Sequence, residues 1–207
     1  TLNGPGTADM KGGLSLMLEG LLAYERSGPA LGYDVIINSD EETGSLSSAE
    51  LIAELAQSKL AALTYEPALP GGVMARARPG SGNFAAVISG RSAHAGRNPE
   101  DGRNAIVAAA DLAQRLHAAR REGLSINPAR IEGGSPNNTV PDLAILHFNM
   151  RPRESADLLS GQTLIATAIH EVTALHQVHI DLSGGFGRPP KAITPSTEHL
   201  FGLVSNA

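Results

Sequence analysis

The stretch from Asp34 to Gly44 constrains the fold of this chain more than any other. The β-branched run Val35 to Ile37 predicts a short strand that is buried on both faces. The acidic residues Asp40, Glu41 and Glu42 follow shortly afterwards, at the carboxyl end of that strand, where open α/β sheets bind their ligands. Adjacent carboxylates repel one another, and a bound cation offsets the repulsion. The stretch therefore predicts a cation site, with a solvated acidic turn as the alternative.

Two further carboxylates occupy comparable places. Asp9 lies in the glycine-rich loop Gly4–Gly13, which precedes a helix predicted from apolar residues at helical spacing and expected to end near Ser27. Lys11 precedes the loop's last glycines, so the order of a phosphate-binding loop is absent. Glu66 closes the apolar run Leu60–Tyr65, which predicts a second strand. These carboxylates would gather at one edge of a parallel sheet, where they could hold a divalent metal ion.

The helix between these two strands is predicted from a capping motif. Ser47 to Glu50 has the spacing of a capping box, and the apolar residues that follow continue a short helix. Alternation of helix and strand is typical of a parallel α/β sheet. Two strands cannot bury such a sheet. The chain also starts without methionine and stops soon after a helical pattern begins near Leu200, so we expect it to be a fragment.

The second half of the sequence predicts a different architecture. Strands and helices alternate there as β-α-β-β-α-β, the order of a ferredoxin-like α+β sandwich. The expected elements are residues 84–89, 104–121, 125–131, 143–150, 158–175 and 178–182. Glycine- and proline-rich stretches at 70–82 and 184–190 predict hinges on either side. We therefore expect residues 1–79 to begin a doubly wound catalytic domain, 80–184 to form an inserted dimerisation or lid domain, and 185–207 to return to the first domain.

Composition narrows the ligand class. The net charge of -5 and the sequence pI near 5.8 argue against nucleic acid or an anionic membrane as the main partner. The sequence has no cysteine, which excludes disulfides and thiolate metal sites and leaves carboxylates and imidazoles as metal ligands. No run of 18 apolar residues predicts a transmembrane helix. We expect a cytoplasmic protein, with the periplasm as the alternative.

Several motifs resemble, in order, those of one enzyme family. Gly4–Gly13, Asn38–Ser45 and Tyr65–Pro67 are similar to three signatures of the dinuclear zinc metallopeptidases and amidohydrolases. This family is typified by carboxypeptidase G, acetylornithine deacetylase, succinyl-diaminopimelate desuccinylase and aminoacylase-1, and the motif spacing is closest to carboxypeptidase G. The inserted region adds the motifs Ser92–Gly96, Asn104-Ala105, Gly133–Pro141 and Met150-Arg151.

The resemblance implies a role for each acidic residue. Asp9 would bridge two Zn²⁺ ions per full-length subunit, Glu42 would bind one of them and Glu66 the other, while Glu41 would be the general base. Asp40 is expected to be structural. The family's two histidine ligands are not found, because one belongs before Gly4 and the other beyond Ala207. We therefore expect the chain by itself to be inactive.

The resemblance also implies substrate-binding residues. His94 would reach the active site of the partner subunit in a homodimer and stabilise the oxyanion, while Asn138 and Arg151 would bind the substrate carboxylate. The alternatives are a loop histidine without function and a surface arginine at a strand end. The other histidines are expected to be surface or packing residues.

The expected function is zinc-dependent hydrolysis of the amide bond of an N-acyl or peptidyl amino acid that has a free carboxylate. Two alternatives remain open: a deacylase or carbamoylase of the same family, and a non-catalytic dimerisation or binding module with a vestigial metal site.

Overall fold

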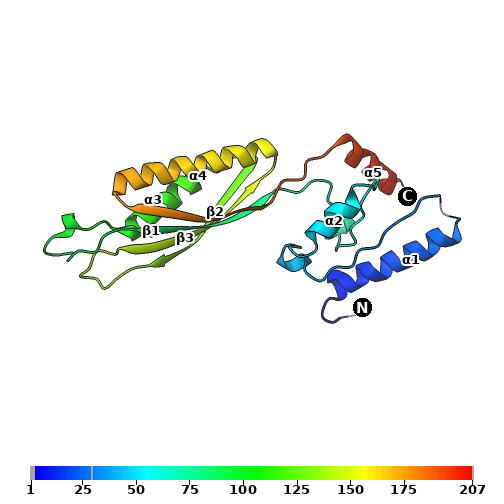
Figure 1. Cartoon of the computed structure of the whole chain (residues 1–207), viewed down its shortest axis with the longest axis horizontal. Helices are drawn as coiled ribbons and strands as arrows, with labels where there is room; N and C mark the ends of the chain where they lie inside the picture. The colour runs from blue at the N-terminus through cyan, green and yellow to red at the C-terminus, as the bar shows by residue number, and fades with distance from the viewer. Residues whose placement is uncertain (1–2, 29, 207) are drawn as a thin grey trace. The chain divides into compact units, whose positions relative to one another are not determined.

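The structure is a computed structural model that describes residues 3–28 and 30–206. The chain divides into two compact units (Figure 1). Unit 1 consists of residues 1–76 and 196–207, and unit 2 consists of residues 77–195. No helix in the described ranges has the length and apolar character needed to cross a membrane.

Unit 2 is a four-stranded antiparallel sheet with two helices on one face (Figure 1). Its main elements are β1 (Ser81–Ser89), α3 (Ala105–Ala118), β2 (Leu124–Gly133), β3 (Leu143–Pro152), α4 (Ser155–His176) and β4 (His179–Arg188). The strand order β2-β3-β1-β4, with every neighbouring pair antiparallel, is that of the predicted ferredoxin-like sandwich. The prediction for this region is confirmed.

Alternating side chains build the core of unit 2. Phe84, Ala86 and Ile88 of β1 are buried, and their neighbours in the strand are half-buried or exposed. The helices bury one stripe each against this face, including Leu112 of α3 and Val172 of α4. The period of two in the strands and the helical period in α3 and α4 therefore meet in one core, as the sequence pattern requires.

Local interactions set the ends of these helices. Asn104 caps α3 by accepting a hydrogen bond from the backbone N–H of Val107. Glu154 and Asp157 form a reciprocal capping box at the start of α4. β4 continues as far as Arg188, and the glycine-rich stretch at 184–188 pairs with β1 except at Gly187, where the register shifts.

Unit 1 contains α1 (Gly12–Arg26), α2 (Ala49–Ala56), nearly all of α5 (Pro195–Ser205) and short 3₁₀ turns at Glu41–Thr43 and Pro70–Gly72. A short helical turn, η1 (Thr7–Lys11), precedes α1. A further 3₁₀ turn, η4 (Pro99–Asp101), lies in unit 2. Arg76 ties α5 to the chain that leaves unit 1: its Nη1 lies 2.9 and 3.1 Å from the two carboxylate oxygens of Glu198, and its guanidinium lies over the Phe201 ring.

The prediction of two strands in unit 1 is wrong for the described residues. Neither Val35–Ile37 nor Leu60–Tyr65 pairs with another segment, and Ile37 is 70% and Leu60 91% exposed. A strand needs a neighbour to receive its backbone hydrogen bonds, and no described residue of unit 1 supplies one. No described residue of unit 1 is buried either, so these apolar runs lack the cover that a parallel sheet requires.

The predicted capping box before α2 is also wrong, although the helix itself is confirmed. Ser48 occupies the N-cap position but makes no capping hydrogen bond with its side chain. Its hydroxyl donates instead to Asp40, 2.7 Å away. The hydroxyl of Ser48 is therefore hydrogen-bonded to the acidic turn and does not cap α2.

A partly buried ion cluster joins α3 to α4 and predicts a pH effect on stability. His176 Nε2 and Arg115 Nε each lie 2.9 Å from a carboxylate oxygen of Asp111, and Arg115 also contacts Glu171. Burial raises the pKa of Asp111, but the hydrogen bonds from His176 and Arg115 outweigh burial and hold the pKa below its usual value. The folded state therefore keeps this charge to lower pH than the unfolded chain does.

A folded-state pKa below the unfolded value of ~3.9 gives stability that is present above that pH and is lost as pH falls through the folded pKa. We expect Asp111→Asn to lower the unfolding free energy of unit 2 by about 1–3 kcal/mol at neutral pH and to flatten its decline in acid. Urea unfolding at pH 7 and at pH 3 measures both effects. Glu122→Gln is the control, because the Glu122 side chain is 91% exposed. An unchanged acid slope in Asp111→Asn would contradict the expectation.

Candidate functional site

Four predicted acidic residues gather in unit 1. Partial desolvation raises the pKa of Glu66, and the negative charges of Asp9, Glu41 and Glu42 and a side-chain hydrogen bond with Asp9 raise it further. The structure thus brings together a loop before α1, the turn at Glu41–Thr43 and the segment after Tyr65. The outermost of these residues, Asp9 and Glu66, are 57 positions apart in the sequence.

A close approach of two backbones places the Asp9 loop beside Glu66. Gly13, in the first turn of α1, lies against the backbone of Tyr65, and a Cβ atom at position 13 would overlap the Tyr65 carbonyl oxygen. The loop itself is closed by hydrogen bonds from Lys11, whose backbone N–H donates to Gly6 and whose Nζ donates to Pro5, both at 2.8 Å. The glycines therefore serve close packing at the site as well as the tight turn expected from the sequence.

The acidic turn is fixed by Asp40. Its carboxylate accepts hydrogen bonds from Asn38, Ser47 and Ser48. The side-chain hydrogen bonds from Ser47, Ser48 and Asn38 hold the pKa of Asp40 far below its usual value. The structural role expected for Asp40 has its physical basis in these contacts. The serines that surround Asp40 were not predicted as its partners, because their spacing matched a capping box.

The cluster suits a divalent cation in charge and in donor type. Its donors are carboxylate oxygens, and crowding of negative charge at Glu66 is the condition that a cation relieves. Across residues 3–28 and 30–206, however, no three histidine, aspartate or glutamate side chains are placed to enclose one metal ion. The cluster therefore fits part of a ligand shell.

In unit 2, two predicted substrate-binding residues lie side by side. The loops at 92–96 and 138–140 pair through backbone hydrogen bonds, with Ala95 N–H donating to the Asn138 carbonyl at 2.9 Å and a bridge between His94 and Thr139. His94 Nδ1 accepts a hydrogen bond from the Gly96 N–H at 3.1 Å. Because Nδ1 accepts this hydrogen bond, Nε2 is the ring nitrogen of His94 that can donate one.

Arg151 does not lie with His94 and Asn138. Asn138 precedes the first residue of β3, Leu143, whereas Arg151 is next to its last residue. A strand of ten residues spans roughly 30 Å, so Asn138 and Arg151 lie near opposite ends of β3. Within one copy of the chain, the two residues expected to bind the substrate carboxylate are therefore separated along β3.

Asn149, which no sequence motif singled out, orients Arg151. Its Oδ1 accepts a hydrogen bond from Arg151 Nε at 3.1 Å, and its Nδ2 donates to Gly82 O and Asn83 Oδ1 at 2.9 and 2.8 Å. The two Nη groups of Arg151 have no hydrogen-bond or ion-pair partner among the residues described. An arginine fork held at Nε is suited to bind a carboxylate through its Nη groups.

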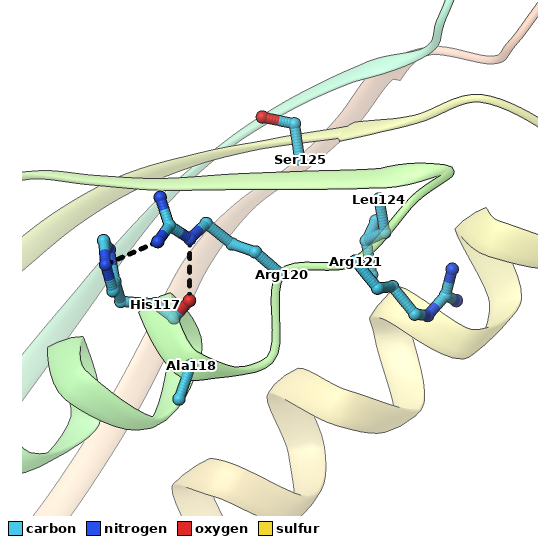
Figure 2. A pocket seen from close by; sticks show the side chains of 6 residues that line it. All are labelled: His117, Ala118, Arg120, Arg121, Leu124 and Ser125. Atoms are coloured by element: carbon cyan, nitrogen blue, oxygen red, sulfur yellow. Dashed lines mark hydrogen bonds between the residues drawn. The ribbon is translucent and has the colours of Figure 1, made fainter.

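A shallow pocket of about 470 Å³ opens where α3 turns into β2 (Figure 2). Arg120 points toward His117 and donates to its backbone carbonyl at 2.8 Å, whereas Arg121 points away from this pair (Figure 2). Arg121 is bound to Asp157 at 2.6 Å. None of the predicted site residues lines this pocket, and its arginines are already occupied by contacts within the chain.

Comparison with known proteins finds matches to a peptidase domain family and to curated hydrolases. Residues 76–176 match the peptidase dimerisation domain of the M20 family. The chain is 34% identical over 162 residues to carboxypeptidase G2 from Pseudomonas sp. (strain RS-16), an alignment that covers 74% of this chain and 38% of that protein. It is 42% identical over 81 residues to one chain of the p-aminobenzoyl-glutamate hydrolase from Escherichia coli (strain K12), covering 35% of this chain and 19% of that one.

Among solved structures, aminopeptidase PepT from Bacillus cereus ATCC 10987 superimposes with a TM-score of 0.80 at 22% identity, covering 96% of this chain and 53% of that one. At this identity the likeness establishes the fold. The chain spans about two fifths of the length of carboxypeptidase G2. These comparisons show that the chain carries the M20 peptidase dimerisation domain and resembles carboxypeptidase G2 over about three quarters of its length.

Proposed function

We propose that the chain is part of a zinc-dependent hydrolase that cleaves the amide bond of an N-acyl or peptidyl amino acid with a free carboxylate. The observation that carries this proposal is the convergence of Asp9, Glu41 and Glu42 on Glu66, with the pKa of Glu66 raised by desolvation and by their charges. Similarity to carboxypeptidase G2 and to a p-aminobenzoyl-glutamate hydrolase supports a substrate that ends in glutamate or a similar acid.

Asp9, Glu42 and Glu66 would supply carboxylate ligands to the zinc ions. When bound, zinc polarises the amide carbonyl and lowers the pKa of a water molecule toward ~7. Glu41 would take a proton at its carboxylate and pass it to the leaving nitrogen. For one glutamate to act as the base and the other as a ligand, Glu41 and Glu42 must point in different directions. The 3₁₀ turn Glu41–Thr43, which contains both, permits this.

The substrate carboxylate would be bound by Arg151, whose guanidinium is held at Nε by Asn149. His94 and Asn138 lie at the other end of the same sheet, so they would serve a different active site from the one that Arg151 serves. A homodimer formed through unit 2 accounts for this arrangement, because each copy would then supply His94 to its partner. The match of residues 76–176 to a dimerisation domain supports this proposal.

Metal content tests the proposal directly. We expect the natural protein that contains these residues to bind zinc, and we expect Glu42→Ala to lose most of it, because that change removes a carboxylate ligand. Elemental analysis after dialysis against micromolar zinc measures the ratio of metal to protein. Glu50→Ala is the matched control, since Glu50 is an exposed acid of α2 and lies outside the cluster.

Equal zinc in the wild-type chain and in Glu42→Ala would contradict the assignment of Glu42. Absence of zinc from both would favour the alternative of a dimerisation or binding module, because a module without chemistry has no need of the metal.

A further inference from the structure

The carboxylate of Asp40 is saturated with hydrogen bonds from within the chain. Oδ2 accepts from the Ser47 N–H at 2.9 Å, from the Ser47 hydroxyl at 2.6 Å and from the Ser48 N–H at 3.0 Å. Oδ1 accepts from the Ser48 hydroxyl at 2.7 Å and from Asn38 Nδ2 at 3.0 Å. A carboxylate offers about four lone-pair positions, so these five contacts leave no room for a metal ion.

The backbone of Asp40 closes the turn that carries Glu41 and Glu42. Its carbonyl oxygen accepts from the N–H groups of Thr43 and Ser45 at 3.2 and 2.8 Å and from the Thr43 hydroxyl at 3.0 Å. Gly44 completes the turn with a φ of 98°, which favours glycine. Asp40 therefore holds the turn from both sides, through its side chain toward α2 and through its carbonyl toward Ser45.

We propose that Asp40 is a positioning residue, which binds no cation itself and fixes the Glu41–Thr43 turn so that Glu41 and Glu42 face Glu66 in two defined directions. This inference rests on the proposed function for the value of that arrangement, but the hold of Asp40 on the turn can be measured separately. Two adjacent glutamates can serve as base and ligand only if the turn between them is rigid, because a rotating backbone would exchange their positions.

The geometry also explains why an acid occupies position 40 beside two others. The charge of Asp40 adds to the repulsion in this run, but the N–H groups of Ser47 and Ser48 lie just before the first residue of α2, where the helix dipole favours a negative charge. The charge of Asp40 is thus bound at the start of α2.

The experiment compares Asp40→Ala, Asp40→Asn and the wild-type chain in two measurements. The first is hydrogen exchange at the N–H groups of Thr43, Gly44 and Ser45. We expect exchange in Asp40→Ala to be faster by roughly tenfold or more, because the contacts that anchor the turn to Ser47 and Ser48 are gone. Asp40→Asn retains the shape and one acceptor oxygen, so it should be intermediate. Asp34→Asn is the matched control, since Asp34 belongs to the same stretch and, among the described residues, its carboxylate pairs with Lys59 alone.

The second measurement is Zn²⁺ affinity by calorimetric titration. We expect a loss of roughly tenfold or more in Asp40→Ala although every proposed metal ligand is still present. Unchanged exchange in the turn would overturn the inference, and so would faster exchange with unchanged affinity. The titration uses the natural protein that contains these residues. If that protein binds no zinc, the proposed function fails, while the exchange rates still decide whether Asp40 holds the turn.

A third variant covers the case in which Asp40→Ala does not fold. Ser47→Ala removes one of the five hydrogen bonds and leaves the charge in place. We expect it to raise exchange at Gly44 and Ser45 by a smaller factor, and exchange at the wild-type rate would count against the inference.

Discussion

Gly13→Ala is expected to detach the start of α1 from the segment that carries Glu66. In an ordinary helix the change from glycine to alanine stabilises by about 1 kcal/mol. At position 13, however, a Cβ atom would overlap the carbonyl oxygen of Tyr65, and this atom belongs to the backbone and cannot rotate away. We therefore expect a net loss of about 1–3 kcal/mol in the local stability of the α1 start. Zn²⁺ affinity should also fall, because Asp9 would move away from Glu66.

Gly20→Ala is the matched control, because it lies in the same helix and a Cβ atom there would contact nothing within 4 Å. The two substitutions should have opposite signs: hydrogen exchange of the α1 amides should become faster in Gly13→Ala and slower in Gly20→Ala. Parallel zinc titrations should show a loss in the first variant alone. Equal behaviour of the two variants would mean that Gly13 has no packing role at the site.

The fold of unit 2 was predictable because its signals are local and agree with one another. Apolar residues alternate along β1 and β3, and Leu112 and Leu116 repeat at helical spacing in α3. Each element buries its own stripe against the same core, so the sequence pattern and the tertiary packing impose the same structure. The end of β4 was not predicted, because its glycines favour a turn locally and only pairing with β1, as at Gly184 and Gly185, makes this stretch a strand.

The strands of unit 1 could not be predicted in the same way. Val35–Ile37 has the β-branched composition of a buried strand, but a strand exists only when a neighbour accepts its hydrogen bonds. That neighbour is a property of the whole sheet, and local sequence carries no information on it. The same limit applies to Ser47, which has the spacing of a capping-box residue but whose hydroxyl donates to Asp40.

The acidic cluster was predictable as a set, because three carboxylate positions follow apolar runs or glycine-rich turns. Its support was not, since the contact of Gly13 with Tyr65 and of Asp40 with Ser47 join residues that no spacing rule connects. Separation of Arg151 from His94 was equally hidden, because it follows from the length and direction of β3.

Glu41→Gln is expected to reduce amide hydrolysis by roughly 10²–10⁴-fold while leaving zinc binding intact. Glutamine has nearly the shape of glutamate and would preserve the 3₁₀ turn, but its amide cannot take up a proton from the attacking water. Glu42→Gln, one residue further on, should lose zinc as well as activity. Hydrolysis of an N-acyl glutamate is measured in the natural protein that contains these residues, together with its zinc content. Glu50→Gln, in the exposed first turn of α2, is the control for loss of a nearby charge.

The pair of variants separates the two roles that the turn must keep apart. If Glu41→Gln loses zinc and Glu42→Gln retains it, the assignments of base and ligand are exchanged, and Asp40 would still be needed to hold the two side chains apart. If both variants retain zinc and turn over at the wild-type rate, the acidic run has no part in catalysis. Full zinc content with slow turnover in Glu41→Gln alone requires a group that acts on protons without binding metal, and in this turn Glu41 is the residue placed beside Glu42 and Glu66 to do so.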